Sequence, residues 1–269
     1  MPSYLITGAS RGLGFEFLRQ LSADPNNLVI GLVRNKPATE EKVAAEFPGR
    51  NVHLVQGELT DYEALKNAVS EVEKITPSLD HLIANAAHVS SWSAYDGIGD
   101  LAAKSPQELN NDILESIRVN VLGNISLFSL FLPLVQNGTA KKIVTITTGM
   151  ADLELISAFD VVAAAPYSIS KAAMNAAYAK FSAQYRKDGV LFMGVSPGLV
   201  DTGNYEATPE QLAGMQEMVK QFATYAPGFK GPITPEESVG FVLETIHRAE
   251  ISKGYAGAFV SHYGNKQWL

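Results

Sequence analysis

The sequence contains no cysteine among its 269 residues, and this absence excludes two classes of protein. Without thiols the chain forms neither a disulfide framework nor a thiolate metal centre. The five histidines, at positions 53, 81, 88, 247 and 262, show no metal-ligand spacing. We therefore expect no bound metal.

Charge is also scarce, because only 18% of the residues are Asp, Glu, Lys or Arg and the net charge is −7. An acidic chain of this kind does not offer a surface for nucleic acid. The longest apolar stretch, 119–135, is interrupted by Asn, Ser and Pro residues, which predicts a buried helix rather than a membrane span. Because a strand is expected to begin at residue 3, we expect no signal peptide. We expect a cytoplasmic protein.

Strand-like runs alternate with helical patterns along the whole chain, which predicts an α/β fold. The expected architecture is a doubly wound parallel sheet (Rossmann fold) in a three-layer α/β/α sandwich, formed as a single domain over residues 1–269. Strands are expected near 3–7, 28–33, 52–56, 80–84, 142–147, 190–196 and 257–260. Helices are expected near 12–23, 38–47, 61–74, 107–135, 167–187, 208–222 and 235–249.

The first predicted strand runs directly into a glycine-rich turn, GASRGLG at 8–14, and then into an amphipathic helix. This order brings a pyrophosphate to a helix N-terminus. Gly8 permits the tight turn, Gly12 lets the backbone approach a phosphate, and Gly14 lets the helix pack close to the strand. The pattern predicts a dinucleotide site.

The second predicted strand ends in Arg34-Asn35-Lys36, where sites specific for NAD usually have an acidic residue for the ribose diol. The guanidinium of Arg34, or that of Arg11 in the glycine turn, can instead bind a 2′-phosphate. The sequence therefore favours NADP(H). A solvated basic turn is the simpler alternative.

Tyr167 and Lys171 are four residues apart in a predicted helix and share one of its faces. A nearby ammonium favours the phenolate and lowers the pKa of a tyrosine from about 10. The phenol then becomes a usable acid or base near neutral pH. An ordinary amphipathic helix also shows this spacing, so the pair gains weight only beside the dinucleotide turn.

Over nearly its whole length, and in the expected order, the chain resembles the classical short-chain dehydrogenases/reductases. The turn at 7–14 is similar to the cofactor turn of the family, and Asn85-Ala86-Ala87 is similar to its Asn-Ala-Gly motif. Pro197-Gly198 and Thr202 match the segment that holds the nicotinamide end. The stretch 149–152 and the length that follows it resemble fungal carbonyl reductases of secondary metabolism.

The resemblance implies a role for each catalytic residue. Tyr167 donates the proton, and Lys171 lowers the pKa of Tyr167 and holds the nicotinamide ribose. Asn120 anchors a water that links Lys171 to solvent, and Thr148 falls where the family has the Ser that holds the substrate carbonyl. The implied cofactor-binding residues are Gly8, Ser10, Arg11, Gly12, Leu13, Gly14, Arg34, Asn35, Glu58, Leu59, Asn85, Ala86, Ala87, Asn120, Tyr167, Lys171, Pro197, Gly198, Val200 and Thr202.

Several positions depart from the family pattern. Thr148 keeps the hydroxyl but adds a methyl group that fixes χ1 and crowds the site. Ala87 replaces a glycine near the nicotinamide, and Glu58 is one methylene longer than the usual Asp. The stretch from Met150 to Pro166 is longer than in most members and is expected to be a loop over the substrate cleft.

The resemblance also implies a mobile substrate lid at 204–231, a stretch that contains Met215, Met218, Phe222, Tyr225 and Phe229. Its apolar side chains indicate a bulky, apolar substrate. Plain core packing at helical spacing is the alternative. The stretch 90–95 after the fourth strand is the second segment on the substrate side, and His88 is expected at the rim.

These observations predict an NADP(H)-dependent carbonyl reductase or alcohol dehydrogenase that acts on a small molecule. A non-redox isomerase or cyclase on the same fold is the alternative, and the changes at Thr148 and Ala87 motivate it. A cofactor-sensing interaction protein ranks last, since such proteins generally lose the catalytic Tyr. The alanines on the Tyr167 helix allow a homodimer or homotetramer through the helices that carry Asn120 and Tyr167, or else they face the sheet.

Overall fold

The computed structural model describes residues 1–203 and 208–269. Its centre is a seven-stranded parallel sheet in the order β3-β2-β1-β4-β5-β6-β7. Most of these strands are apolar runs buried on both faces, as expected for a sheet covered by helices on both sides. The strands are β1 Ser3–Thr7, β2 Leu28–Val33, β3 Val52–Gln56, β4 His81–Ala84, β5 Lys142–Ile146, β6 Leu191–Ser196 and β7 Phe259–Ser261.

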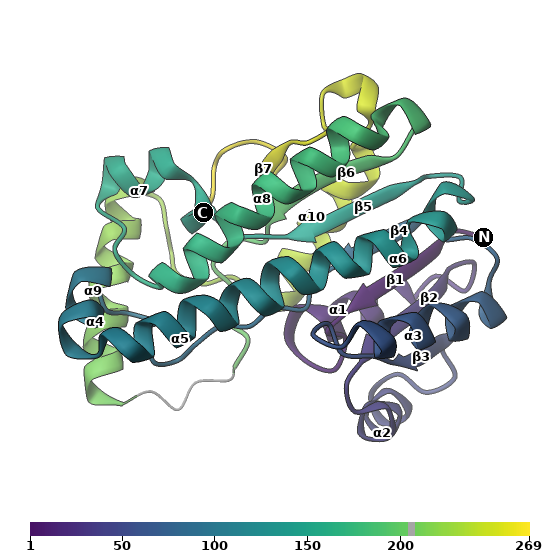
Figure 1. The fold of residues 1–269 in the computed structure, drawn as a ribbon, viewed down its shortest axis with the longest axis horizontal. Helices are drawn as coiled ribbons and strands as arrows, with labels where there is room; N and C mark the ends of the chain where they lie inside the picture. The colour runs from purple at the N-terminus through teal and green to yellow at the C-terminus, as the bar shows by residue number, and fades with distance from the viewer. Residues whose placement is uncertain (204–207) are drawn as a thin grey trace.

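Helices cover both faces of the sheet and form the predicted three-layer, doubly wound arrangement (Figure 1). One face carries α3 (Tyr62–Ile75), α6 (Asn124–Gln136) and α8 (Ala165–Tyr185), which share a core with the strands. The other carries α1 (Gly12–Leu21), α2 (Lys36–Glu46) and α10 (Pro235–Arg248), which share a second core. The predicted fold class is confirmed, whereas the single domain over 1–269 stays a prediction.

The predicted helix 107–135 is a continuous helical rod with a change of pitch inside it. It consists of α5 (Pro106–Ile117), a π-helical turn at Arg118–Gly123, and α6. Pro106–Gln136 is long and apolar enough to cross a membrane by composition, but 56% of its most apolar window is buried inside the protein. Phe128 and Phe131 of α6 are fully buried in the core on that face of the sheet. This burial supports the prediction of a core helix.

Two short helices are additional to those predicted from the sequence. Helix α4 spans Ile98–Lys104, and α7 spans Leu153–Phe159 within the supposed loop 150–166. The loop prediction was therefore wrong in this part, because Asp152 caps α7 by accepting a hydrogen bond from the backbone N–H of Glu154 (2.9 Å). A helix of seven residues makes two turns, too few to show a clear apolar period.

Helix α9 (Pro209–Tyr225) packs against α7. Together with α4, these helices form an end of the molecule beyond the carboxyl ends of the strands (Figure 1). Residues 204–207 of the predicted lid lie outside the described residues. The described part of that stretch is helical, and its function as a lid stays a prediction.

Candidate active site

The ends of β1 and β4 are tied together at the glycine-rich turn. Asn85 donates a side-chain hydrogen bond to the carbonyl of Thr7 (3.0 Å), and the hydroxyl of Thr7 accepts from the backbone N–H of Asn85 and of Ala86. Gly8 has a φ of +66°, and a Cβ there would lie 2.9 Å from the Cα of Ala86. Two predicted cofactor segments therefore meet, and the turn requires glycine at this position.

The glycine turn also meets the segment after β6. A Cβ at Gly12 would lie 3.6 Å from a methyl carbon of Thr202, so these two predicted residues are neighbours across 190 positions of sequence. Helix α1 begins at Gly12, and its N-cap Arg11 makes no side-chain capping hydrogen bond. The first N–H groups of a helix have no partner within the helix. This N-terminus can therefore receive a phosphate.

The predicted site for the 2′-phosphate is a solvent-exposed edge. The side chain of Arg34 is 79% exposed, and its Nε lies 3.8 Å from the carboxylate of Glu58. Arg11 is exposed as well. Asn35 is the N-cap of α2 and accepts a hydrogen bond from the backbone N–H of Ala38 (3.2 Å). Both guanidinium groups are accessible to an anion from solvent. Asn35 has a structural role as the cap at the start of α2.

Lys171 is the most deeply buried of the Asp, Glu, Lys and Arg residues in the described part of the chain. Its residue is 1% exposed, and Nζ donates a hydrogen bond to the carbonyl of Ile146 at the end of β5 (2.7 Å). Burial lowers the pKa of Lys171 to about 8. The ammonium also lies 5.6 Å from the centre of the Tyr167 ring. The predicted catalytic pair is therefore held together at the carboxyl end of a central strand.

Asn120 lies in the π-helical turn and is fully buried. Its side chain accepts from the backbone N–H of His88 (2.7 Å) and donates to the carbonyl of the same residue (3.0 Å). It also donates to the hydroxyl of Ser170 (2.9 Å), which in turn donates to the carbonyl of Tyr167 (2.7 Å). Asn120 thus joins the loop after β4 to helix α8. A direct contact with Lys171 is not among its hydrogen bonds.

Thr148 follows β5 and begins the 3₁₀ turn Gly149–Ala151. Its hydroxyl accepts a hydrogen bond from the backbone N–H of Met150 (3.3 Å). The preceding residue, Thr147, is buried and donates to the side chain of Asn175 on α8 (2.9 Å). In these two contacts the hydroxyl of Thr147 acts as a donor, whereas the hydroxyl of Thr148 acts as an acceptor. The hydroxyl of Thr148 can therefore still donate its proton to a substrate oxygen.

His262 supports the turn at Pro197 and Gly198. A Cβ at Gly198 (φ +84°) would lie 2.9 Å from its ring, and the residue is 2% exposed. Burial lowers the pKa of His262 to about 4, so the ring is neutral at physiological pH. The carbonyl of Pro197 accepts a hydrogen bond from Ser238 on α10 (2.7 Å).

Val200 pairs with Ile233 in an isolated parallel bridge. This bridge joins the two ends of the segment that contains α9.

The sequence reasoning missed Ser170, Asn175 and His262. Ser170 and Asn175 carried one usable signal, since polar residues on the buried face of a helix need partners. His262 carried none, because its contact with Gly198 joins segments that are remote in sequence. The predicted rim residue His88 has a side chain that is 34% exposed, and its Nε2 lies 3.7 Å from a carboxylate oxygen of Asp112.

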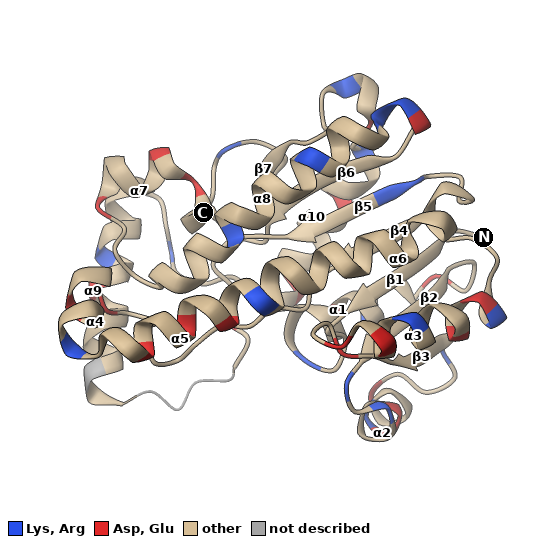
Figure 2. Ribbon diagram, in the orientation of Figure 1, with Lys and Arg blue, Asp and Glu red and all other residues tan. Residues whose placement is uncertain are grey.

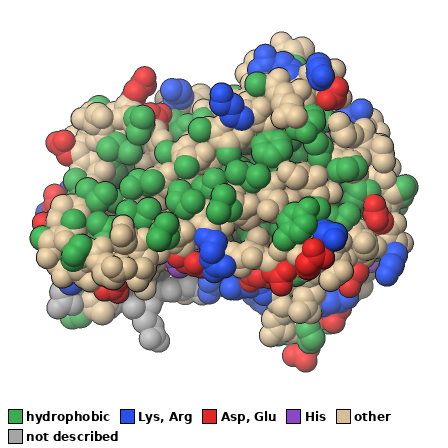
Figure 3. Space-filling model, viewed as in Figure 1, with side chains coloured by type: hydrophobic (Ala, Val, Ile, Leu, Met, Phe, Trp, Pro, Cys, Tyr) green, Lys and Arg blue, Asp and Glu red, His purple; other side chains and the backbone are tan. Residues whose placement is uncertain are grey.

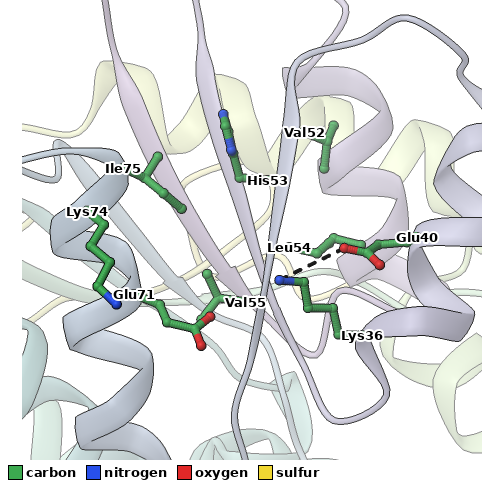
Figure 4. A pocket seen from close by; sticks show the side chains of 9 residues that line it. All are labelled: Lys36, Glu40, Val52, His53, Leu54, Val55, Glu71, Lys74 and Ile75. Carbon is green, nitrogen blue, oxygen red and sulfur yellow. Dashed lines mark ion pairs between the residues drawn. The ribbon is translucent and has the colours of Figure 1, made fainter.

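A hollow of about 480 Å³ lies elsewhere, along the exposed side of edge strand β3 (Figure 4). Lys36 and Glu40 form an ion pair on one wall, at 3.9 Å. None of the predicted catalytic residues lines it. Within residues 1–203 and 208–269, no group of three or more His, Asp or Glu side chains could hold a metal ion.

The family model of the short chain dehydrogenases matches residues 3–213. The chain belongs to this family. Fungal members of the family are similar to it over their full length. The short chain dehydrogenase virK of Hypocrea virens is 56% identical, and the short-chain dehydrogenase/reductase iacC of Pestalotiopsis fici is 47% identical, with 100% of each chain covered.

Solved structures of carbonyl reductases share the fold. The NADPH-bound carbonyl reductase from chicken fatty liver is 25% identical, with a TM-score of 0.75 and 98% of both chains covered. The carbonyl reductase Sniffer of Drosophila melanogaster has the same TM-score and coverage at 22% identity. Membership of the short-chain dehydrogenase family assigns this protein to the oxidoreductases.

Proposed function

We propose that this protein is an NADP(H)-dependent carbonyl reductase or alcohol dehydrogenase whose substrate is a bulky, apolar ketone, aldehyde or alcohol. The observation that carries the proposal is the buried ammonium of Lys171, which lies beside the Tyr167 ring at the end of β5. Burying an ammonium carries a desolvation cost, and the hydrogen bond to the carbonyl of Ile146 offsets it only in part. The fungal relatives support a role in fungal secondary metabolism.

The proposed chemistry assigns one task to each residue. Tyr167 donates the proton to the developing alkoxide, and the hydroxyl of Thr148 stabilises the same oxygen. Lys171 keeps the phenol of Tyr167 acidic enough to give up its proton. Asn120 holds the loop after β4 against α8 and keeps a route for protons from Lys171 to solvent. When bound, the nicotinamide would supply the hydride.

The residues of the glycine turn fit a dinucleotide. Gly8 and Gly12 have positive φ, the start of α1 lacks a side-chain cap, and Thr202 lies beside Gly12. Arg11 and Arg34, both exposed, are the proposed ligands of the 2′-phosphate. The proposed cofactor is therefore NADP(H), and the NADPH bound to the chicken relative supports it.

A panel of aldehydes, ketones and quinones tests the proposal, with loss of NADPH absorbance as the readout. Turnover of at least one apolar carbonyl, faster than that of acetone, is expected. NADPH binding without turnover of any carbonyl would contradict the redox function and favour the non-redox isomerase or cyclase. The pairing of Tyr167 with Lys171 counts against that alternative.

Arg34→Asp tests the choice of cofactor. The change removes a charge-assisted hydrogen bond to the 2′-phosphate and adds an acceptor for a ribose diol. The ratio of kcat/KM for NADPH over NADH should fall by about tenfold or more, as expected from hydrogen bonds to charged groups. Lys74→Asp, on α3, is the control. An unchanged ratio would mean that Arg34 is a surface charge only.

The proposal includes a soluble cytoplasmic enzyme that forms a homodimer or homotetramer through α5, α6 and α8. Charged side chains are sparse along α6 and α8 (Figure 2), and apolar side chains gather over the same helices in the space-filling view (Figure 3). Leu114 of α5 is 65% exposed, and Leu122 of the π-helical turn is 55% exposed. Light scattering should give at least twice the monomer mass, and Leu122→Asp should lower it.

A further inference from the structure

A third apolar cluster lies at the end of the molecule beyond the strands, separate from the two cores that cover the sheet. It joins α7, α9 and the last residues of the chain, and its buried members are Leu155, Val161, Ala163, Met218, Phe222 and Trp268. Met150 and Leu199 pack against it, and each lies within two residues of a predicted site residue, Thr148 and Gly198. The cluster therefore lies next to two of the predicted site segments.

Trp268 is packed against the turn that follows Thr148. A Cβ added to Gly149 would lie 2.6 Å from the Cβ of Trp268, and the three heavy atoms nearest to it all belong to this tryptophan. Gly149 does not have a positive φ, so its backbone conformation suits any residue. The glycine is required by the neighbouring side chain. On the other side, the N–H of Gly149 donates to the buried hydroxyl of Ser196 (3.0 Å).

The C-terminal residues also hold helix α9. The hydroxyl of Tyr225, the last residue of α9, donates to the carbonyl of Lys266 (3.1 Å) and accepts from the backbone N–H of Trp268 (3.0 Å). The Tyr225 ring packs edge-on against Phe159 at the end of α7. The indole of Trp268 stacks on Phe259 of β7, with ring centres 4.4 Å apart. One short segment thus contacts the sheet, the Thr148 turn and α9.

We propose that the C-terminal segment Lys266–Leu269 shapes the substrate side of the site, with Trp268 and Tyr225 as positioning residues. Trp268 sets the turn that carries Thr148, and Tyr225 makes the placement of α9 depend on the same segment. The inference rests on the proposed function for its kinetic consequences only, because the packing of Gly149 against Trp268 can be measured without any reaction.

The kinetic test compares the full chain with a chain that ends at Gln267 and with Tyr225→Phe. Each is assayed on a bulky aryl ketone and on a small aldehyde, with NADPH affinity measured in parallel. KM for the bulky ketone should rise about fivefold in Tyr225→Phe, in line with lost hydrogen bonds, and further in the shortened chain. NADPH affinity should stay within about twofold, because the glycine turn is not in this cluster.

One control and one conservative variant separate positioning from general stability. Tyr62→Phe removes an exposed hydroxyl on α3 and should match the unmodified protein in the KM ratio of the two substrates. Trp268→Phe keeps an aromatic ring against Phe259, so its KM ratio should lie between that of the unmodified protein and that of the shortened chain. If shortening the chain changes NADPH affinity and both KM values together, the segment only stabilises the protein and the inference is wrong.

The second test measures coupling between Gly149 and the C-terminus. Gly149→Ala should lower the unfolding temperature of the full chain by several degrees and change it much less in the chain that ends at Gln267. Gly240→Ala, on α10, should not depend on the C-terminus. Equal losses in both chains would overturn the inference. Coupling in a protein that reduces no carbonyl would refute the proposed function and leave the positioning contact standing.

Discussion

The two ends of this molecule differ in how directly their sequence determines their structure. The proposed cofactor side is built from local rules: an apolar strand, glycines at positions of positive φ, and an amphipathic helix. The proposed substrate side is built from α4, α7, α9 and the C-terminal segment, and its core joins residues as remote as Leu155 and Trp268. Where contacts are local the pattern of residues is sufficient, and where they are distant it is not.

The proposed cofactor and substrate sides meet at the predicted catalytic pair, Tyr167 and Lys171. Lys171→Met should lower kcat by about 10² or more, since the acid loses the cation that favours its ionised form. The same change should raise the unfolding temperature. The pKa of Lys171 lies near 8 instead of 10.5, so the unfolded chain binds the proton more tightly, by roughly 3 kcal/mol below pH 8.

Thermal unfolding between pH 7 and pH 10.5 measures this prediction. The stability of the unmodified protein should rise as the pH increases from 8 to 10.5, because the folded state has already lost the proton there. Lys171→Met should not show this rise. A variant that is both less stable and fully active would show that the ammonium has a structural role.

Thr148 lies on the boundary between the two sides. Thr148→Val should reduce kcat by roughly one to three orders of magnitude, the effect of losing one donor to a developing oxyanion. Thr148→Ser should retain activity because it keeps the hydroxyl and removes the methyl group. If the valine variant turns over every carbonyl at full rate while the other catalytic residues remain essential, Thr148 does not contact the reacting oxygen.

The sequence predicted the fold and the meeting of the cofactor segments for physical reasons that particular residues illustrate. Parallel strands end at one edge of the sheet, so Gly8 and Asn85 had to be close. Helical spacing put Tyr167 beside Lys171. The links through Ser170, the π-helical turn at Asn120 and the contact of Gly149 with Trp268 depend on side-chain packing between distant segments, which periodicity does not encode.

The smallest effect is expected at the opposite end of the strands, far from both ligand sides. His81 of β4 is 5% exposed and stacks on Tyr4 of β1, with ring centres 4.4 Å apart. Burial, aided by the charges of Lys142 and His247, lowers the pKa of His81 to about 4. The folded state therefore excludes a proton that the unfolded chain accepts below about pH 6.5.

Stability should be full above pH 6.5 and should fall as the pH decreases towards 4, by roughly 2 kcal/mol at pH 5 for this residue. His81→Phe keeps the ring against Tyr4 and should make unfolding less sensitive to acid. Unfolding temperatures at pH 7.5 and pH 5 check this, with kcat at pH 7.5 as the control. A change in kcat would mean that the two ends of the strands are coupled.

In the proposed mechanism, Tyr167 delivers the proton in an NADPH-dependent reduction. The direct test is kcat of Tyr167→Phe on a carbonyl that the unmodified protein reduces, with NADPH affinity measured on the same samples. We expect NADPH affinity within about twofold and kcat lower by about 10²–10⁴, the usual contribution of general acid catalysis. Turnover within a few fold of the unmodified protein would show that Tyr167 is not the proton donor.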